Sequence, residues 1–163
     1  DMNRIYSINE TYIKTIDEKD LFNFFKEYVS KYKKPISQSK ENILLKSMVF
    51  LKNKAKTLED IWNNSQYIIN DKIEIGADDK KLIDDLSKKV IKDFIFEYEK
   101  LSSLSREVLE PVIKSLIDKH KTNFKGVGQP LRIALVGSRF GPGLYDVILS
   151  LDKATVIKRL KQI

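Results

Sequence analysis

The chain has 163 residues, enough for one ordinary domain or two small ones, and 42% of them are hydrophobic, which is sufficient for a core. The lack of cysteine excludes disulfides and thiolate metal sites, and a single histidine, His120, excludes a metal site built from several imidazoles. The net charge is +7, and residues 101–163 hold most of the excess, with 11 lysines and arginines against 5 acidic residues. Such a basic stretch suits nucleic acid, although an unpartnered lysine-rich surface would give the same count.

Apolar residues recur at helical spacing through the first 70 residues and predict three helices after residue 16. Asp17 is expected to cap the first of them. Pro35 is expected to end it, because the residue before a proline is pushed out of the helical conformation. A second helix is expected from about Ser39, and a third after Thr57, which is expected to be its N-cap.

A polar stretch at residues 70–79 interrupts this pattern and is the candidate boundary between two subdomains, 1–70 and 71–163. A long helix is then expected from Asp79 to about Leu101, because apolar residues keep a 3.6-residue spacing along it. The predicted fold class is therefore all-α, with two consecutive helical-bundle subdomains.

Glycine and proline divide the next part of the chain. Ser105 is expected to cap a helix that Pro111 kinks or restarts, since an interior proline removes one backbone hydrogen bond. Residues 122–129 contain two glycines and predict a loop. Pro130 suits the first position of a short helix that follows this loop.

Residues 131–144 combine an apolar run with three glycines and have two interpretations. A buried strand with a glycine-rich turn would suit a dinucleotide, but the glycine spacing is wrong, Pro142 interrupts the turn, and too few residues follow. We therefore expect two short helices, the first ended by Gly137 and the second started by Pro142, with Arg132 in a first turn where backbone N–H groups are free. This geometry suits unstacked bases, although glycines that merely end helices would look the same. A final helix is expected after Asp152.

Several segments occur in the order known from one family. They are residues 129–137 (Gln-Pro-Leu-Arg-Ile-Ala-Leu-Val-Gly), 141–144 (Gly-Pro-Gly-Leu), 151–153 (Leu-Asp-Lys) and 159–160 (Arg-Leu), preceded by 8–14 (Ile-Asn-Glu-Thr-Tyr-Ile-Lys) and 54–58 (Lys-Ala-Lys-Thr-Leu). Together they resemble the C-terminal, anticodon-binding part of bacterial glutamyl-tRNA synthetases, where the longest block reads Pro-Leu-Arg-x-Ala-Leu-Thr-Gly.

The resemblance implies a tRNA-binding module without catalytic residues or a metal site of its own. This family of class I aminoacyl-tRNA synthetases charges tRNA with glutamate, using ATP and Mg²⁺ in a Rossmann-type catalytic domain. The two ATP-binding signatures of that domain are absent from this sequence, so the catalytic domain is expected upstream of Asp1. The implied partner is glutamate tRNA, with glutamine tRNA as a second candidate, and the implied state is a cytoplasmic monomer without membrane contact. A helical protein-interaction or scaffold domain with an incidental basic surface is the alternative.

Family roles transfer only where the motifs match. Arg132 corresponds to an arginine beside the anticodon pocket, and Gln129 lies at the entry of that pocket. Pro142 and Leu144 fall where the family packs apolar surface and backbone against the first anticodon base. Lys54 stands where many members place an arginine that reads the third anticodon base and helps to reject glutamine tRNA. Because lysine lacks the planar fork of arginine, strict discrimination is in doubt.

Overall fold

The structure is a computed structural model that describes residues 8–163, and every regular element in that range is helical. The all-α prediction is therefore confirmed. The chain divides into two compact units, the first ending at Asp71 and the second comprising Lys72–Ile163. Residues 1–7 of the first predicted subdomain lie outside the described residues. None of the described helices combines the length and the apolar composition that a bilayer crossing requires.

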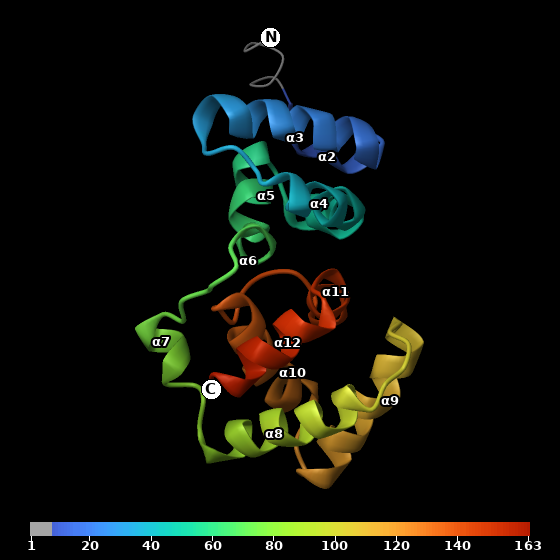
Figure 1. Cartoon of the computed structure of the whole chain (residues 1–163), viewed down its shortest axis with the longest axis vertical. Helices are drawn as coiled ribbons and strands as arrows, with labels where there is room; N and C mark the ends of the chain where they lie inside the picture. Colours follow the sequence, from blue (N-terminus) through green and yellow to red (C-terminus); the bar gives the residue numbers. More distant parts are fainter. Residues whose placement is uncertain (1–7) are drawn as a thin grey trace. The chain divides into compact units, whose positions relative to one another are not determined.

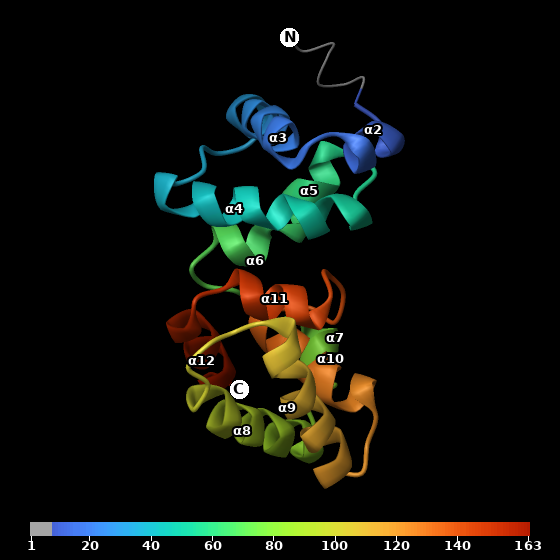
Figure 2. The same cartoon turned by 90° about the vertical axis from the view of Figure 1, so that its right-hand side faces the viewer.

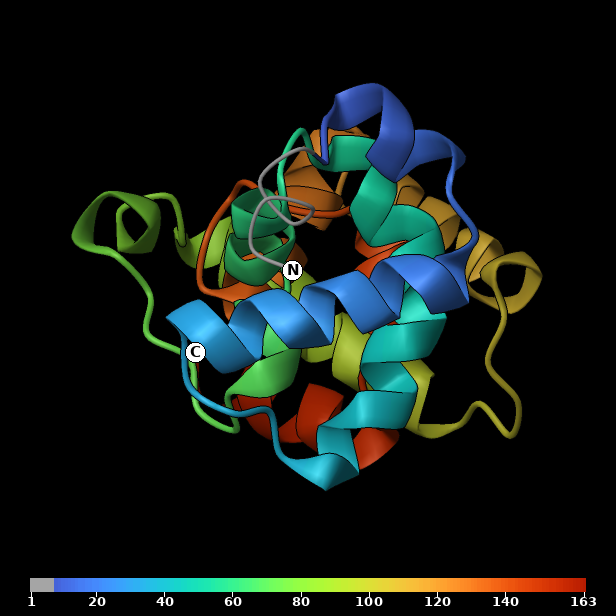
Figure 3. The same ribbon diagram turned by 90° about the horizontal axis from the view of Figure 1, so that it is seen from above.

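The first unit is a small bundle built around two long helices (Figure 1). Its elements are α2 (Glu10–Thr15), α3 (Glu18–Tyr32), α4 (Gln38–Leu51), the 3-10 turn η1 (Lys52–Lys54), α5 (Leu58–Asn64) and α6 (Gln66–Ile69). Helix α3 packs on α4 and α5, and Figure 3 shows that α3 crosses α4. Helix α6 packs on the other long helix, α4. The core consists of fully buried side chains that include Leu21, Phe25, Leu44, Met48 and Ile61.

Polar side chains start two helices of this unit where the sequence predicted them. The Asp17 carboxylate accepts a hydrogen bond from the Lys19 backbone N–H at 3.1 Å, at the start of α3. The Thr57 hydroxyl accepts one from the Asp60 N–H at 3.1 Å, and the Asp60 carboxylate accepts one from the Thr57 N–H at 3.2 Å. This reciprocal capping box pairs two backbone donors that a helix start leaves unpaired.

The second unit is a bundle around α10 (Figures 1 and 2). Its helices are α7 (Ala77–Lys80), α8 (Asp85–Glu99), α9 (Arg106–Lys119), α10 (Phe124–Val136), α11 (Leu144–Ser150) and α12 (Lys153–Lys161). Helix α10 contacts α8, α9, α11 and α12, and α8 also packs on α12. In both views α11 and α8 lie at opposite ends of this unit. The core includes the buried residues Val90, Phe94, Leu109, Val127, Leu131, Val147 and Val156.

The predicted long helix from Asp79 is wrong at its start. Asp79 belongs to the short helix α7, and α8 begins only at Asp85. The Asp84 carboxylate accepts a hydrogen bond from the Ser87 N–H at 2.8 Å and so caps α8. This bond and one from the Ser87 hydroxyl lower the pKa of Asp84. Apolar spacing alone did not locate the start, because Leu82 and Ile83 continue the helical pattern through the intervening turn.

The predicted loop at residues 122–129 is also wrong, because these glycines lie inside α10. Helix α10 is capped by Asn123 and runs without interruption through Pro130. An interior proline costs about 3 kcal/mol, whereas each fully buried large apolar side chain contributes about 1.5–3 kcal/mol. Val127, Leu131 and Leu135 bury completely at helical spacing, so their burial outweighs the proline.

Pro111 does not restart its helix either. Ser105 caps α9 as predicted, since its hydroxyl accepts a hydrogen bond from the Val108 N–H at 3.3 Å, and α9 continues through Pro111. The proline leaves the Glu107 carbonyl without its usual acceptor role in the helix. Both residues are exposed, so water can supply the missing bond.

Polar side chains also link helices of the second unit. The Arg159 guanidinium of α12 is buried, and its Nη1 donates to the Leu135 carbonyl of α10 at 2.7 Å. Asp93 of α8 lies 2.9 Å from the Lys119 Nζ and 2.8 Å from the His120 Nε2. Hydrogen bonds with Lys119 and then His120 hold the pKa of Asp93 below its ordinary value of 3.8, although partial burial opposes the shift.

Candidate nucleic-acid interface

A glycine-bounded loop, residues 137–143, joins α10 to α11 and lies within the segment that the sequence singled out. Gly137 ends α10 with a φ of 91°, and its N–H donates to the Ile133 carbonyl at 2.8 Å. Gly141 has a φ of 143°, a conformation that side chains disfavour. A Cβ atom at Gly137 would lie 2.5 Å from the Glu74 carbonyl oxygen. The prediction that Gly137 ends a helix is confirmed, whereas the next helix starts at Leu144, two residues after Pro142.

The Arg132 side chain, which extends from α10, donates hydrogen bonds to two carbonyls of this loop. Its Nε donates to the Pro142 carbonyl at 3.2 Å, and its Nη1 donates to the Arg139 carbonyl at 3.2 Å. Burial of the guanidinium lowers the pKa of Arg132, which stays charged because an arginine pKa lies so far above neutrality. The expectation that Arg132 stands in a first helical turn is wrong, since α10 begins eight residues earlier at Phe124. Its neighbours are therefore loop carbonyls and not free helix N–H groups.

Arg139 and Phe140 lie in the middle of the loop, and no sequence motif points to either of them. The Arg139 N–H donates to the Asp79 carboxylate at 3.4 Å, and its Nε lies 3.6 Å from the same carboxylate oxygen. Its guanidinium also lies 5.0 Å from the centre of the Phe140 ring. Phe140 is 71% exposed, the largest exposed fraction among the large hydrophobic residues described. A single exposed phenylalanine has no periodic pattern that could have identified it.

The other predicted residues of the second unit are Pro142, Leu144 and Gln129, and each is at least half-buried. Pro142 is buried, and Leu144, which is 2% exposed, packs its side chain into the core at the start of α11. Gln129 is half-buried in α10, one turn before Arg132. The structure therefore brings Arg132 and Pro142 into direct contact, whereas Leu144 lies in the core, against Gly128 of α10.

Lys54 belongs to the first unit, whereas the other four predicted residues belong to the second. It is the last residue of η1 and is exposed. The turn lies just before the capping box of Thr57 and Asp60 that begins α5. The family-derived role of Lys54 stays a prediction.

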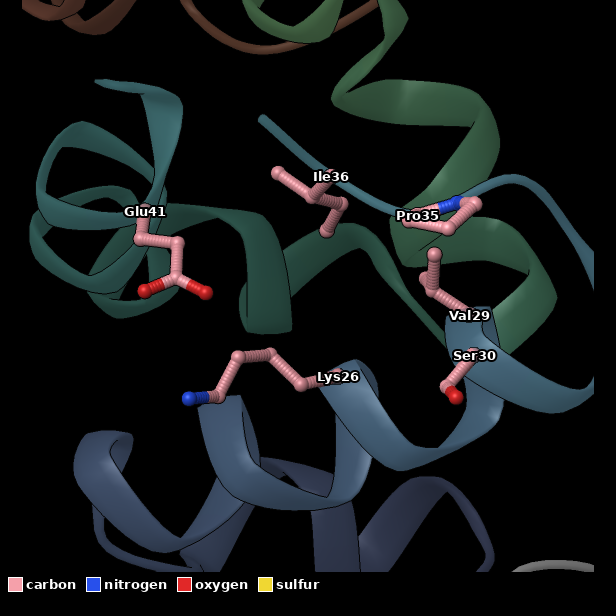
Figure 4. A pocket seen from close by; sticks show the side chains of 6 residues that line it. All are labelled: Lys26, Val29, Ser30, Pro35, Ile36 and Glu41. Carbon is pink, nitrogen blue, oxygen red and sulfur yellow. The ribbon is translucent and has the colours of Figure 1, made fainter. Parts of the chain in front are cut away.

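A pocket of about 180 Å³ also lies in the first unit. Lys26 of α3 and Glu41 of α4 carry its charged groups, and Val29, Pro35 and Ile36 provide apolar surface (Figure 4). One positive and one negative group give this pocket no charge excess for a phosphate, so it is a weaker candidate than the loop. Within residues 8–163 no cluster of three or more His, Cys, Asp or Glu side chains could hold a metal ion.

The helical fold and the basic, glycine-bounded loop can be compared with known families. The family model described as an anticodon binding domain matches residues 14–163. The chain belongs to this family. The anticodon-binding domain is 53% identical over 160 residues to a glutamate–tRNA ligase of Pelagibacter ubique, covering 98% of this chain and 34% of the relative. It is 32% identical over 159 residues to a glutamate–tRNA ligase of Syntrophus aciditrophicus, covering 95% of this chain and 33% of that relative.

Solved structures of similar proteins show the same fold. A glutamate tRNA ligase from Elizabethkingia meningosepticum, in complex with its amino acid, matches with a TM-score of 0.77 and 21% identity, over 94% of this chain and 30% of that one. The glutamate–tRNA synthetase of Elizabethkingia anophelis matches with a TM-score of 0.70 and 22% identity, over the same shares of the two chains. The anticodon-binding domain thus spans about a third of the length of the relatives that it matches.

Proposed function

We propose that this anticodon-binding domain binds the anticodon loop of glutamate tRNA for a glutamate–tRNA ligase. The 53% identity to the Pelagibacter ubique ligase over 98% of the chain supports this most directly. ATP and Mg²⁺ would bind in parts of the ligase outside the matched third, and no step of the ligation is assigned to residues of this domain. The two units would act as consecutive anticodon-binding subdomains in a cytoplasmic, monomeric enzyme.

The loop at residues 137–143 has the chemistry that this role requires. Proteins read single-stranded loops by stacking on unstacked bases and by hydrogen bonds to base edges, while cations contact phosphates. Arg132 has five N–H donors, and two of them bond to loop carbonyls. The others can bond to a base edge or a phosphate, with Gln129 offering an amide nearby. Pro142 and Leu144 are buried and would hold the loop backbone in position against the first anticodon base.

Salt-titrated binding tests the proposal. The domain should bind glutamate tRNA more tightly than an unrelated tRNA across the salt range, since phosphate contacts alone do not distinguish sequences. Arg132→Ala should weaken binding of glutamate tRNA by about tenfold or more and reduce the preference. Lys161→Ala is the matched control, because it also removes one cation of the second unit, but from the exposed end of α12.

Equal affinity for the two tRNAs at every salt concentration would contradict the proposal and favour the scaffold alternative. Equal effects of Arg132→Ala and Lys161→Ala would instead contradict the assignment of the anticodon pocket to Arg132. Circular dichroism of each variant checks that its helices are intact.

Lys54 gives a separate test of tRNA choice. Under the proposal, its point charge contacts the third anticodon base without the bidentate geometry of arginine. Lys54→Arg should therefore increase the ratio of glutamate-tRNA to glutamine-tRNA affinity, whereas Lys56→Arg, two residues later on the exposed surface, should leave the ratio unchanged. An unchanged ratio in both variants would remove Lys54 from the base-reading site.

A further inference from the structure

Phe140 is an exposed aromatic residue in the middle of the 137–143 loop. The residue is 71% exposed, although a phenylalanine gains about 1.5–3 kcal/mol when it is fully buried. The Arg139 guanidinium lies 5.0 Å from the ring centre, and the high exposure leaves much of the ring surface open. The ring therefore offers an aromatic face with a cation beside it.

The loop that carries this ring is held at several points. Arg132 bonds to the carbonyls of Arg139 and Pro142, on either side of Phe140. The Phe140 N–H donates to the Ser138 hydroxyl at 3.0 Å, and Arg139 is held by Asp79 of α7. A backbone fixed in this way presents the ring at a defined place, so little conformational entropy is lost when a ligand stacks on it.

We infer that Phe140 stacks on an unpaired base of the anticodon loop and that Arg139 contacts the adjacent phosphate. This inference rests on the proposed function and adds to it a residue that the family motifs do not include. Stacking on an aromatic ring suits single-stranded RNA, because every base has a π-face, and a neighbouring arginine supplies a cation for the backbone. Within a duplex the bases stack on each other, so no base face would be free to stack on the ring.

A second exposed phenylalanine provides a matched control. Phe96 of α8 is 62% exposed, and the Lys100 Nζ lies 3.8 Å from its ring centre. It therefore shares the exposure, the ring and the nearby cation with Phe140. It differs in position, because α8 lies at the opposite end of the second unit from α11, whose first residue follows the 137–143 loop (Figures 1 and 2).

The test measures binding of this chain to a fluorescently labelled RNA hairpin with a glutamate anticodon loop. Loss of one aromatic stacking platform weakens binding by roughly 5-fold to more than 100-fold, so Phe140→Ala should weaken it by about tenfold. Phe140→Trp should keep or increase the affinity. Phe96→Ala should change it by less than about twofold. The slope of affinity against salt should be unchanged in Phe140→Ala, because the lost contact is uncharged.

Abasic hairpins identify the base concerned. Removing the base that Phe140 contacts should weaken binding of the unmodified chain by a similar factor and should abolish the further effect of Phe140→Ala. Additive losses at every loop position would overturn the inference, because stacked partners must be coupled. Equal losses for Phe140→Ala and Phe96→Ala would overturn it as well.

Failure of the inference is distinguishable from failure of the proposed function. If the unmodified chain prefers the glutamate hairpin over an unrelated hairpin and Phe140→Ala binds normally, only the role of Phe140 is wrong. If the unmodified chain shows no preference, the proposed function is wrong. Because Phe140 is exposed, Phe140→Ala should leave the melting temperature unchanged. Measuring that unchanged melting temperature would exclude misfolding as the cause of a binding loss.

Discussion

Replacement of Gly137 by alanine tests how the candidate interface is held in place. The residue has a φ of 91°, and an added Cβ atom would lie 2.5 Å from the Glu74 carbonyl oxygen. An L-residue in the left-handed region costs about 1–2 kcal/mol, and forcing extra volume into a packed site costs a further 1–3 kcal/mol or so. Because the neighbour is backbone, it cannot rotate aside. We expect a loss of about 3 kcal/mol from the free energy of unfolding.

Urea denaturation followed by far-UV circular dichroism measures this loss. Trp62 is the only tryptophan of the chain and lies in the first unit, so its fluorescence follows that unit separately from the second, which holds Gly137. Gly76→Ala is the control, since Gly76 has a φ of −61° and an added Cβ would meet only the Asp79 carboxylate at 3.7 Å. This control should cost less than about 1 kcal/mol.

Two outcomes would refute the reasoning. If Gly137→Ala and Gly76→Ala unfold at the same urea concentration, the Glu74 carbonyl does not lie against Gly137. If Gly137→Ala is destabilised but binds the glutamate hairpin with unchanged affinity, the start of the loop does not control the position of the interface.

Other sites give further predictions. Thr57→Ala should cost about 1 kcal/mol through loss of the capping box, measured by urea denaturation followed by Trp62 fluorescence, whereas Thr57→Ser should cost less. Asp93 has a lowered pKa, so its contribution to stability is present above its unfolded pKa of about 4 and is lost as the pH falls through the lower folded value. Asp93→Asn should therefore reduce the difference in melting temperature between about pH 7 and pH 3, and an unchanged difference would exclude this role. Arg159→Ala should cost about 2–4 kcal/mol in thermal or urea unfolding, because it removes a buried hydrogen bond to Leu135 and leaves a cavity; a near-neutral result would mean that water replaces the guanidinium.

Much of the fold was predictable from the sequence because the helix starts depend on hydrogen bonds between residues that are close in sequence. Asp17, Thr57, Ser105 and Asp152 each accept a hydrogen bond from a backbone N–H two or three residues later. Contacts of this kind depend on only a few consecutive residues, so the sequence alone identifies them. The all-α class follows from the same local patterns together with the apolar spacing.

The prediction of a loop at residues 122–129 was wrong because tertiary packing overrides the local preference of glycine for loops. Gly126 and Gly128 favour a loop by composition, yet both are helical in α10. A Cβ atom at Gly126 would lie 1.9 Å from the Thr122 hydroxyl oxygen, and one at Gly128 would lie 3.3 Å from the Phe124 ring. These glycines thus make room for neighbouring side chains within a helix that the core requires. No single-residue propensity contains that information.

The candidate interface was predictable only in part for a similar reason. The motif led to Arg132 and Pro142, which the structure brings into contact. It did not indicate that Arg132 bonds to loop carbonyls, because those partners are set by the path of the chain between Gly137 and Leu144. Nor could it select Phe140, because the exposure of this residue and the hydrogen bonds from Arg132 to the loop around it are set by tertiary structure.

The two hydrogen bonds from Arg132 to the loop have a consequence for binding kinetics. A loop that is ordered before its ligand arrives need not rearrange during encounter, so association should be limited by diffusion and electrostatic steering. Differences among tRNAs, and among variants of Arg132 or Phe140, should then appear mainly in the dissociation rate. Rapid release of mismatched anticodons, with similar rates of arrival for all tRNAs, would let the domain sample many molecules before one is retained.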